Sequence, residues 1–234
     1  DLKIAGKTDK GRNIRLLKVA AVIKKPEKKF LISARNHANE SSGSYCVEGM
    51  MHWLLSEDPL ALYALSRHEF YFIPMSNPDG VADGMARHTG DKLTDLNKTE
   101  QWHRDNCPAA LSDSTLKVYT GLLDSIQPTH FMNLHSYLFK FQDELYVRTA
   151  EEAERFFRFI PDQIKYGKVW KTRIHDHQPF PTGYCHEKYD TFPLLPEIPW
   201  FGRNAAAMRE TGAGLLRAFI LMNTVGAANW GDIW

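Results

Sequence analysis

Two histidines and one glutamate in this chain have the residue types and the spacing of a metal site. His37 and Glu40 lie three positions apart, directly after the apolar segment 30–34, and His135 directly follows the apolar segment 129–134. Two imidazoles and one carboxylate, with a fourth position left for water, form the ligand set of a catalytic zinc site. Either histidine alone would be interpreted as a surface or hydrogen-bonded residue, so the metal hypothesis depends on the surrounding elements and motifs.

The elements that must position these residues follow from the hydrophobic pattern. Apolar segments rich in β-branched and aromatic residues alternate with segments of helical period, which is typical of an α/β fold with a mostly parallel sheet. Such sheets bind ligands at the carboxyl ends of their strands, which is where His37, Glu40 and His135 stand. We predict strands over residues 14–23, 30–34, 69–74, 129–134, 144–148 and 192–195, and helices carrying the apolar stripes of residues 47–55, 116–126, 153–160 and 204–222.

Three more polar motifs follow predicted strands or lie in the long polar connection 87–108. Asn-Pro-Asp-Gly occupies positions 77–80, Arg87 and the sequence Asp-Leu-Asn-Lys at 95–98 come next, and Pro-Glu-Ile-Pro-Trp occupies 196–200. A polar connection of this length inside a compact domain is usually either functional or disordered. We therefore give the polar residues of this connection more weight than isolated ones.

The order and rough spacing of these motifs resemble the zinc carboxypeptidase family. Segment 6–14 looks like the first strand of that family with its preceding turn, and segment 34–40 and the Asp-Leu-Asn element are most similar to its cytosolic and bacterial branch. The resemblance implies a mixed, mostly parallel, eight-stranded twisted sheet flanked by helices. It also implies one zinc ion per chain, held by His37, Glu40 and His135.

The same resemblance implies roles for residues around the metal. Glu197 corresponds to the family's catalytic glutamate, which takes a proton from zinc-bound water and passes it to the leaving amine. Arg87 corresponds to the arginine that stabilises the oxyanion, with one extra residue between it and the Asp-Leu-Asn element. Asp95 corresponds to the acid that accepts a hydrogen bond from His37 and fixes the orientation of its ring.

The substrate side of the site departs from the family pattern. Asn97 and Lys98 stand where the family usually has Asn-Arg to clamp the substrate's terminal carboxylate. Lysine offers a point charge in place of a planar, two-pronged donor, so either the carboxylate is held less rigidly or the substrate presents another group there. We expect Tyr137 to line the cleft wall and the specificity pocket to fall around residues 183–187.

The remaining candidates are interpreted as structural. Tyr184 and Tyr189 lie in the region of the family's active-site tyrosine, but packing is the favoured role for both. His88, His103 and His186 are expected at the surface or at the rim of the site. His175 and His177 could bind a second metal, but we favour solvent-exposed positions.

Length and composition limit the alternatives. The 234 residues, 43% hydrophobic and 24% charged, predict a single catalytic domain over residues 1–234. Because 29 Lys and Arg face 28 Asp and Glu, the net charge of +1 argues against a protein that binds nucleic acid or a membrane surface through a broad field. Three cysteines are too few for a disulfide framework, and we find no signal peptide or membrane-spanning run, so a cytoplasmic location is favoured.

We therefore expect a zinc metallopeptidase that cleaves an amide bond at the C-terminus of a peptide or protein. One alternative keeps the metal but changes the substrate, as in the amidases and N-deacylases of the succinylglutamate desuccinylase and aspartoacylase type. Lys98 is the residue that keeps this alternative open. Another alternative is a binding domain that has the same fold without catalytic turnover.

Overall fold

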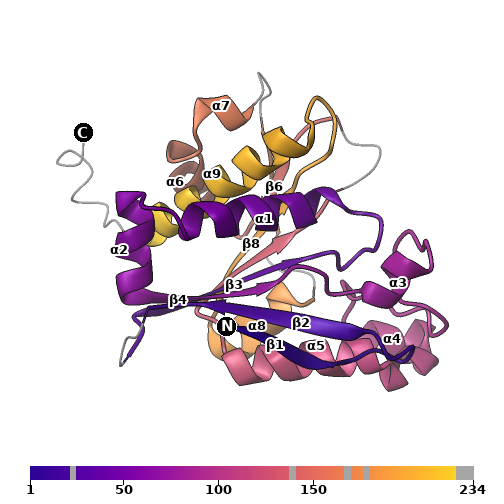
Figure 1. Ribbon diagram of the computed structural model, residues 1–234. Coiled ribbons are helices and arrows are strands. Elements are labelled where there is room, and N and C mark those ends of the chain that lie inside the picture. Colours follow the sequence, from indigo (N-terminus) through magenta and orange to yellow (C-terminus); the bar gives the residue numbers. More distant parts are fainter. Residues whose placement is uncertain (22–24, 137–140, 166–169, 176–179, 225–234) are drawn as a thin grey trace.

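The computed structural model describes residues 1–21, 25–136, 141–165, 170–175 and 180–224, which form one sheet with helices on both faces (Figure 1). The strand order in the sheet is β1-β2-β4-β3-β5-β8-β6-β7. The strands are β1 (Leu2–Lys7), β2 (Asn13–Val19), β3 (Lys28–Ala34), β4 (His68–Ile73), β5 (His130–Leu134), β6 (Glu144–Val147), β7 (Lys171–Ile174) and β8 (Phe192–Glu197). The helices are α1 (Ser42–Leu54), α2 (Pro59–Arg67), α3 (Pro78–Ala82), α4 (Glu100–Asn106), the 3-10 helix η1 (Pro108–Ser112), α5 (Ser114–Ile126), α6 (Ala150–Arg158), α7 (Asp162–Lys165), α8 (Thr182–Tyr189) and α9 (Ala205–Thr224).

The centre of the sheet is parallel, one side is antiparallel and the other side is mixed. Strand β3 pairs in parallel with β4 and β5, and β5 pairs in parallel with β8. The pairs β1–β2, β2–β4 and β6–β8 are antiparallel, whereas β6–β7 is parallel. The predicted mixed, mostly parallel, eight-stranded sheet is confirmed, and the carboxyl ends of β3, β4, β5 and β8 meet at one edge.

The sequence pattern missed the outer strands and the short helices. Strand β1 is an edge strand whose Leu2 and Ile4 are exposed, and β7 has only four residues, so neither has a buried apolar run. Strand β2 ends at Val19, earlier than predicted, and part of its predicted end lies outside the described residues. Helices α2, α3, α4, α7 and α8 and the 3-10 helix η1 were not predicted, because short helices carry few turns of apolar period.

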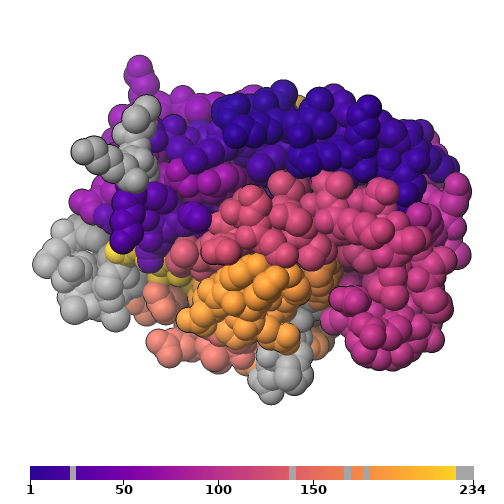
Figure 2. All heavy atoms as spheres, turned by 90° about the horizontal axis from the view of Figure 1, so that it is seen from below, coloured from indigo at the N-terminus to yellow at the C-terminus, as the bar shows by residue number. Residues whose placement is uncertain are grey.

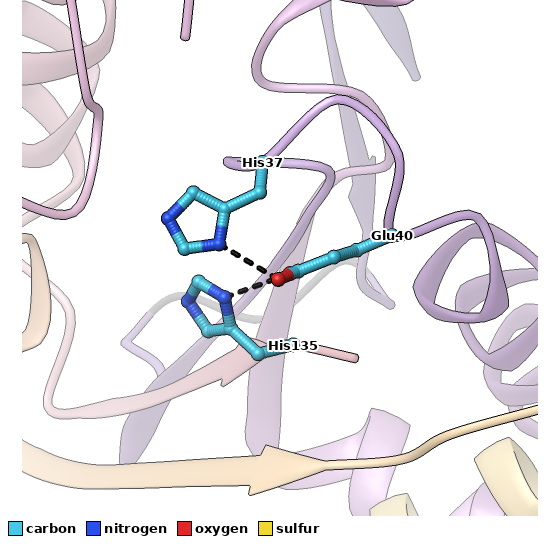
Figure 3. Close-up of side chains that lie close together, drawn as sticks. All are labelled: His37, Glu40 and His135. Atoms are coloured by element: carbon cyan, nitrogen blue, oxygen red, sulfur yellow. Dashed lines mark hydrogen bonds and ion pairs between the residues drawn. The ribbon is translucent and has the colours of Figure 1, made fainter. Parts of the chain in front are cut away.

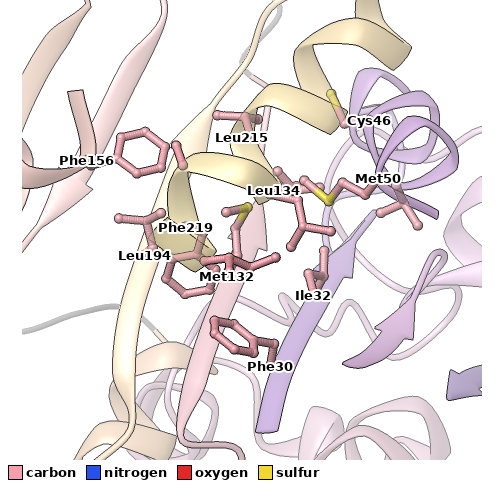
Figure 4. Close-up of a cluster of buried hydrophobic side chains, with 14 of the residues drawn as sticks. Phe30, Ile32, Cys46, Met50, Met132, Leu134, Phe156, Leu194, Leu215 and Phe219 are labelled. Carbon is pink, nitrogen blue, oxygen red and sulfur yellow. The ribbon is translucent and has the colours of Figure 1, made fainter. Parts of the chain in front are cut away.

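Two apolar cores hold the sheet between its helices. The larger one joins β3, β5 and β8 to α1, α6 and α9 through residues such as Phe30, Met132 and Phe219 (Figure 4). The smaller one joins the other face to α5 and α8 through Tyr119, Leu123 and Cys185. The sheet is thus buried on both faces, which makes its central strands a rigid platform for the site.

Local interactions fix the loops at the carboxyl edge. Asp113 accepts hydrogen bonds from the first backbone N–H groups of α5 and from the Thr89 and Thr94 side chains. The buried Asp79 accepts hydrogen bonds from the hydroxyl of Thr8 and the guanidinium of Arg12, so the Asn-Pro-Asp-Gly motif anchors the β1–β2 turn. Among the helices of the described residues, none has the length and apolar character to span a membrane.

Candidate metal centre

The turn after β3 carries His37 and Glu40 and is held by Arg35. Arg35 adopts the left-handed backbone conformation (φ 62°), which turns the chain sharply at the end of the strand. Its Nε and Nη2 groups donate hydrogen bonds of 2.9 and 2.6 Å to the carbonyl oxygen of Ala38. This two-pronged contact closes the loop between the two predicted ligands.

His135 is fixed by the backbone at the carboxyl end of β5. Its N–H donates to the carbonyl of Pro196 at 3.0 Å, and its carbonyl accepts from the N–H of Ile198 at 2.8 Å. These bonds pair His135 with Glu197, the last residue of β8, in a parallel bridge. Directly paired residues of neighbouring strands share a face of the sheet, so the Glu197 side chain leaves the sheet on the same face as His135.

The fold brings the three predicted ligands together, as Figure 3 shows. The Nδ1 atoms of His37 and His135 lie 2.7 and 2.8 Å from the two carboxylate oxygens of Glu40. Candidate ligand atoms of the three residues all lie within 4.8 Å of one another, and all three side chains are buried. Two imidazole nitrogens and a carboxylate that converge in this way fit the donor preference of zinc.

Electrostatic interactions inside the cluster are strong. Burial tends to raise the pKa of Glu40, but the two histidines outweigh it and lower that pKa to about 2. Burial tends to lower the pKa of His37, but hydrogen bonds to Asp95 and Glu40 raise it to about 9. A bound cation would compete with these ring protons for the same carboxylate and imidazoles.

Asp95 connects the cluster to the polar loop that follows α3. Its carboxylate oxygens lie 3.3 Å from Nε2 of His37 and 2.6 Å from Nε of Arg87, and one of them accepts the N–H of Asn97 at 2.9 Å. Burial tends to raise the pKa of Asp95, but His37 and Arg87 hold it well below its usual range. The structure thus places Asp95 against the ring that it was predicted to orient, with Arg87 beside it.

The predicted substrate-binding residues are only partly described. Asn97 and Lys98 lie two and three residues after Asp95, and the Lys98 ammonium lies over the ring of Trp102, 5.6 Å from its centroid. Tyr137 lies outside the described residues. Tyr184 and Tyr189, for which packing was the favoured role, donate hydrogen bonds from their hydroxyls to Asp124 of α5.

A cavity of about 610 Å³ lies between α4, α5 and α8. The face that these helices form is seen in Figure 2, with α8 in orange beside α5 in pink. Gly183, Tyr184 and Glu187 line this cavity, so it coincides with the region where the specificity pocket was predicted. The three clustered ligands do not line it.

The histidine predictions need one correction and one addition. His103 was expected at the surface or rim but is buried, with Nε2 placed 3.0 Å from the carbonyl oxygen of Asp95. Asn133, which lies two residues before His135 and contacts its ring, was not predicted. A polar residue two positions from a candidate ligand on a strand shares its face, which is the signal that could have revealed Asn133. His177 lies outside the described residues, and His175 is exposed.

Comparisons with known proteins agree with this geometry. A sequence profile described as zinc carboxypeptidase matches residues 1–137. Mouse (Mus musculus) cytosolic carboxypeptidase 4 is 36% identical over 99 residues, which are 42% of this chain and 8% of that protein. Human (Homo sapiens) cytosolic carboxypeptidase 4 is 34% identical over 128 residues, 53% of this chain and 11% of that protein. The chain therefore spans about a tenth of the length of these curated relatives.

Solved structures share the fold at low sequence identity. A metallo-carboxypeptidase from Burkholderia cenocepacia superposes with a TM-score of 0.74 and 22% identity, covering 95% of this chain and 64% of that one. Carboxypeptidase A from Helicoverpa armigera superposes with a TM-score of 0.74 and 13% identity, covering 99% of this chain and 69% of that one. With a family profile matching more than half of its residues, this chain belongs to the zinc carboxypeptidase family.

Proposed function

We propose that residues 1–234 form the catalytic domain of a zinc metallocarboxypeptidase that hydrolyses an amide bond at the C-terminus of a peptide or protein. The observation that supports this most is the buried convergence of His37, Glu40 and His135, paired through the sheet with Glu197. The family membership of the chain supports the same activity.

In this proposal, His37, Glu40 and His135 hold one zinc ion. Zinc bound there would lower the pKa of a water molecule to about 7 and polarise the scissile carbonyl. Glu197 takes the proton of the attacking water and delivers it to the leaving amine, which needs a carboxylate on the same face as His135. Arg87 supplies positive charge for the oxyanion.

The other residues of the site orient the ligands and the substrate. Asp95 holds the His37 ring through its Nε2 atom. Asn97 and Lys98 bind the terminal carboxylate of the substrate, and Tyr137 lines the cleft. Because Lys98 replaces the usual arginine, the second candidate is an amidase or N-deacylase, whose substrate need not end in a peptide carboxylate.

Zinc content and hydrolysis together test the proposal. The purified wild type should hold about one zinc ion per chain, and His37→Ala and His135→Ala should lose it. Glu197→Gln should keep zinc and lose hydrolysis of C-terminal peptide bonds by roughly three or more orders of magnitude, because it removes the base and not a ligand. A wild type purified without chelator that contains no zinc contradicts the metal site. Normal turnover in Glu197→Gln contradicts the assigned base.

A further inference from the structure

A buried chain of hydrogen bonds ends on Nε2 of the His135 ring, the nitrogen that does not face Glu40. Nδ2 of Asn133 donates to Nε2 of His135 at 2.9 Å, while Oδ1 of Asn133 accepts the hydroxyl of Ser33 at 2.8 Å. The hydroxyl of Tyr119 in turn donates to Ser33 at 2.9 Å. Asn133, Ser33 and Tyr119 are each 0% exposed, so water does not replace these contacts.

The two nitrogens of the His135 ring face different partners. In the neutral ring form whose Nε2 accepts from Asn133, the proton is on Nδ1, which lies 2.8 Å from Glu40 Oε2. A metal ligand must present a nitrogen without a proton, so binding through Nδ1 requires the proton of the neutral ring to be on Nε2. The group that faces Nε2 must then accept a hydrogen bond where it now donates one.

An asparagine side chain can serve both ring forms. Its amide carries two N–H donors at one end and a carbonyl acceptor at the other, and rotation by half a turn exchanges them. After that rotation, Nδ2 would face Ser33, whose hydroxyl oxygen can accept just as it can donate.

We propose that Asn133 is a positioning residue for the metal site, which holds the His135 ring toward His37 and Glu40 in both ring forms. It offers its amide N–H to Nε2 without metal and its carbonyl oxygen to Nε2–H with metal. The inference rests on the zinc site of the proposed function.

Asn133 also connects the metal ligand to the substrate side of the site. Its Nδ2 lies 3.5 Å from Oδ1 of Asn97, the residue assigned to the substrate carboxylate. When the amide rotates, that N–H moves away and Asn97 Oδ1 loses this contact. The rotation therefore links metal binding to the arrangement of Asn97.

Two substitutions separate the hydrogen bond from the volume of the side chain. Asn133→Leu has a similar shape and no hydrogen-bonding group, whereas Asn133→Asp can only accept and therefore matches the metal-bound ring form. The zinc Kd of the full chain is measured by competition with a chromogenic chelator, and folding is checked by circular dichroism. We expect about 10- to 100-fold weaker zinc binding in Asn133→Leu, and binding within about threefold of wild type or tighter in Asn133→Asp.

A matched control comes from the same strand. Met132→Leu changes a buried side chain of β5 that points to the opposite face, into the core with α9, and should bind zinc within about threefold of wild type. Ser33→Ala removes the hydroxyl that holds Asn133 and should weaken binding by a smaller factor than Asn133→Leu. If Asn133→Leu does not fold, Ser33→Ala and Asn133→Asp still test the inference.

Nitrogen-15 NMR of the His135 ring adds a readout that does not depend on activity. The wild type should have Nδ1–H without metal and Nε2–H with zinc. The inference is overturned if Asn133→Leu binds zinc as tightly as wild type, or if Asn133→Asp and Asn133→Leu weaken binding equally. If Asn133→Leu does not fold, the inference is overturned when Ser33→Ala binds zinc as tightly as wild type. A wild type that binds no zinc instead contradicts the metal site itself, so the two failures are distinguishable.

Discussion

At the scale of single residues, backbone hydrogen bonds hold Asn97 and Lys98, the pair proposed to bind the substrate carboxylate. The N–H of Lys98 donates to the carbonyl of Asp95 at 3.0 Å, and the N–H of Asn97 donates to the Asp95 carboxylate. The Lys98 ammonium rests over Trp102, a cation–π contact worth about 0.5–1 kcal/mol where solvent has access. The hydrogen bonds to Asp95 therefore fix the backbone positions of Asn97 and Lys98, and the Trp102 ring restricts the position of the Lys98 ammonium.

Lys98→Ala should raise KM about tenfold for peptides that end in a free carboxylate, because a charge-assisted contact is worth about 1.5–3 kcal/mol. C-terminally amidated peptides should change little, since they have no carboxylate to lose. Steady-state kinetics with matched acid and amide peptides measures the difference. Lys3→Ala, which removes an exposed lysine from edge strand β1, is the control and should leave KM unchanged. An equal response of the two peptide series would show that Lys98 is not the carboxylate anchor.

At the scale of elements, α1 and α9 approach each other at two glycines. A Cβ atom on Gly49 would collide with the backbone carbonyl of Arg209, and one on Gly212 would collide with the carbonyl of Cys46. Because both obstacles are backbone, the helices would have to separate to admit a methyl group. The two helices lie side by side over the sheet in Figure 1, and α1 begins two residues after Glu40, so their packing also positions a predicted ligand.

Gly212→Ala should destabilise the fold by about 1–3 kcal/mol, because overpacking outweighs the better helix propensity of alanine. Gly121→Ala is the matched control on α5, where a Cβ atom meets nothing within 4 Å. That control should stabilise the fold by about 0.5–1 kcal/mol through propensity alone. The midpoints of urea unfolding measure both changes. A neutral or stabilising Gly212→Ala would mean that α1 and α9 can part at no cost.

A buried ion pair holds the loop between β8 and α9. Arg203 donates to both carboxylate oxygens of Asp143 and to the carbonyls of Pro199 and Ile164, and both charged side chains are 0% exposed. This arrangement ties the segment after Glu197 to the start of β6. A buried charge without its partner is strongly unfavourable, so each member depends on the other.

Asp143→Ala should therefore destabilise the fold by about 3–5 kcal/mol, because it leaves a buried guanidinium without its carboxylate. The double variant Asp143→Ala, Arg203→Met should recover part of that loss, which a double-mutant cycle in urea measures. The exposed pair between Arg104 and Glu100 is the control, and Arg104→Ala should change stability by less than about 1 kcal/mol. Additive effects in the cycle would contradict the coupling.

At the scale of the whole molecule, the hydrophobic pattern of the sequence predicted the central strands and the long helices, and it missed the edge strands and the short helices. The strands that precede His37 and His135 are buried and apolar, so the hydrophobic pattern identified them and the polar residues that follow. Helix α8 was missed because its sequence has no apolar stripe, and its place is set by contacts with β8 and β5 and by hydrogen bonds to Asp124 of α5. Asn133 was missed for a similar reason, since its importance depends on Ser33 and Tyr119, which are distant in sequence.

The amino end of the sheet, opposite the metal cluster, contains a histidine buried among aromatic rings. His130 begins β5 and lies against Phe30, Phe192 and Phe219. Burial, helped by the nearby charge of Lys28, lowers the pKa of His130 to about 3. The unfolded chain binds a proton at this residue near pH 6.5, whereas the folded protein does so only near pH 3, so stability must fall as the pH decreases between these values.

His130→Gln should flatten the loss of stability between pH 6.5 and 4.5, which we expect to be about 2–3 kcal/mol from this residue in wild type. Carboxylates whose pKa values are lowered in the folded protein, such as Glu40, change the stability mainly below pH 4.5. The raised pKa of His37 changes the stability above pH 6.5, where stability is lost as the pH rises toward about 9. Burial also lowers the pKa of His68, so the His130→Gln variant should still lose some stability as the pH falls, with a smaller slope than wild type. Urea unfolding at four pH values compares the wild type, His130→Gln and the exposed control His52→Gln. Equal slopes in all three would show that His130 does not stay neutral in the folded protein.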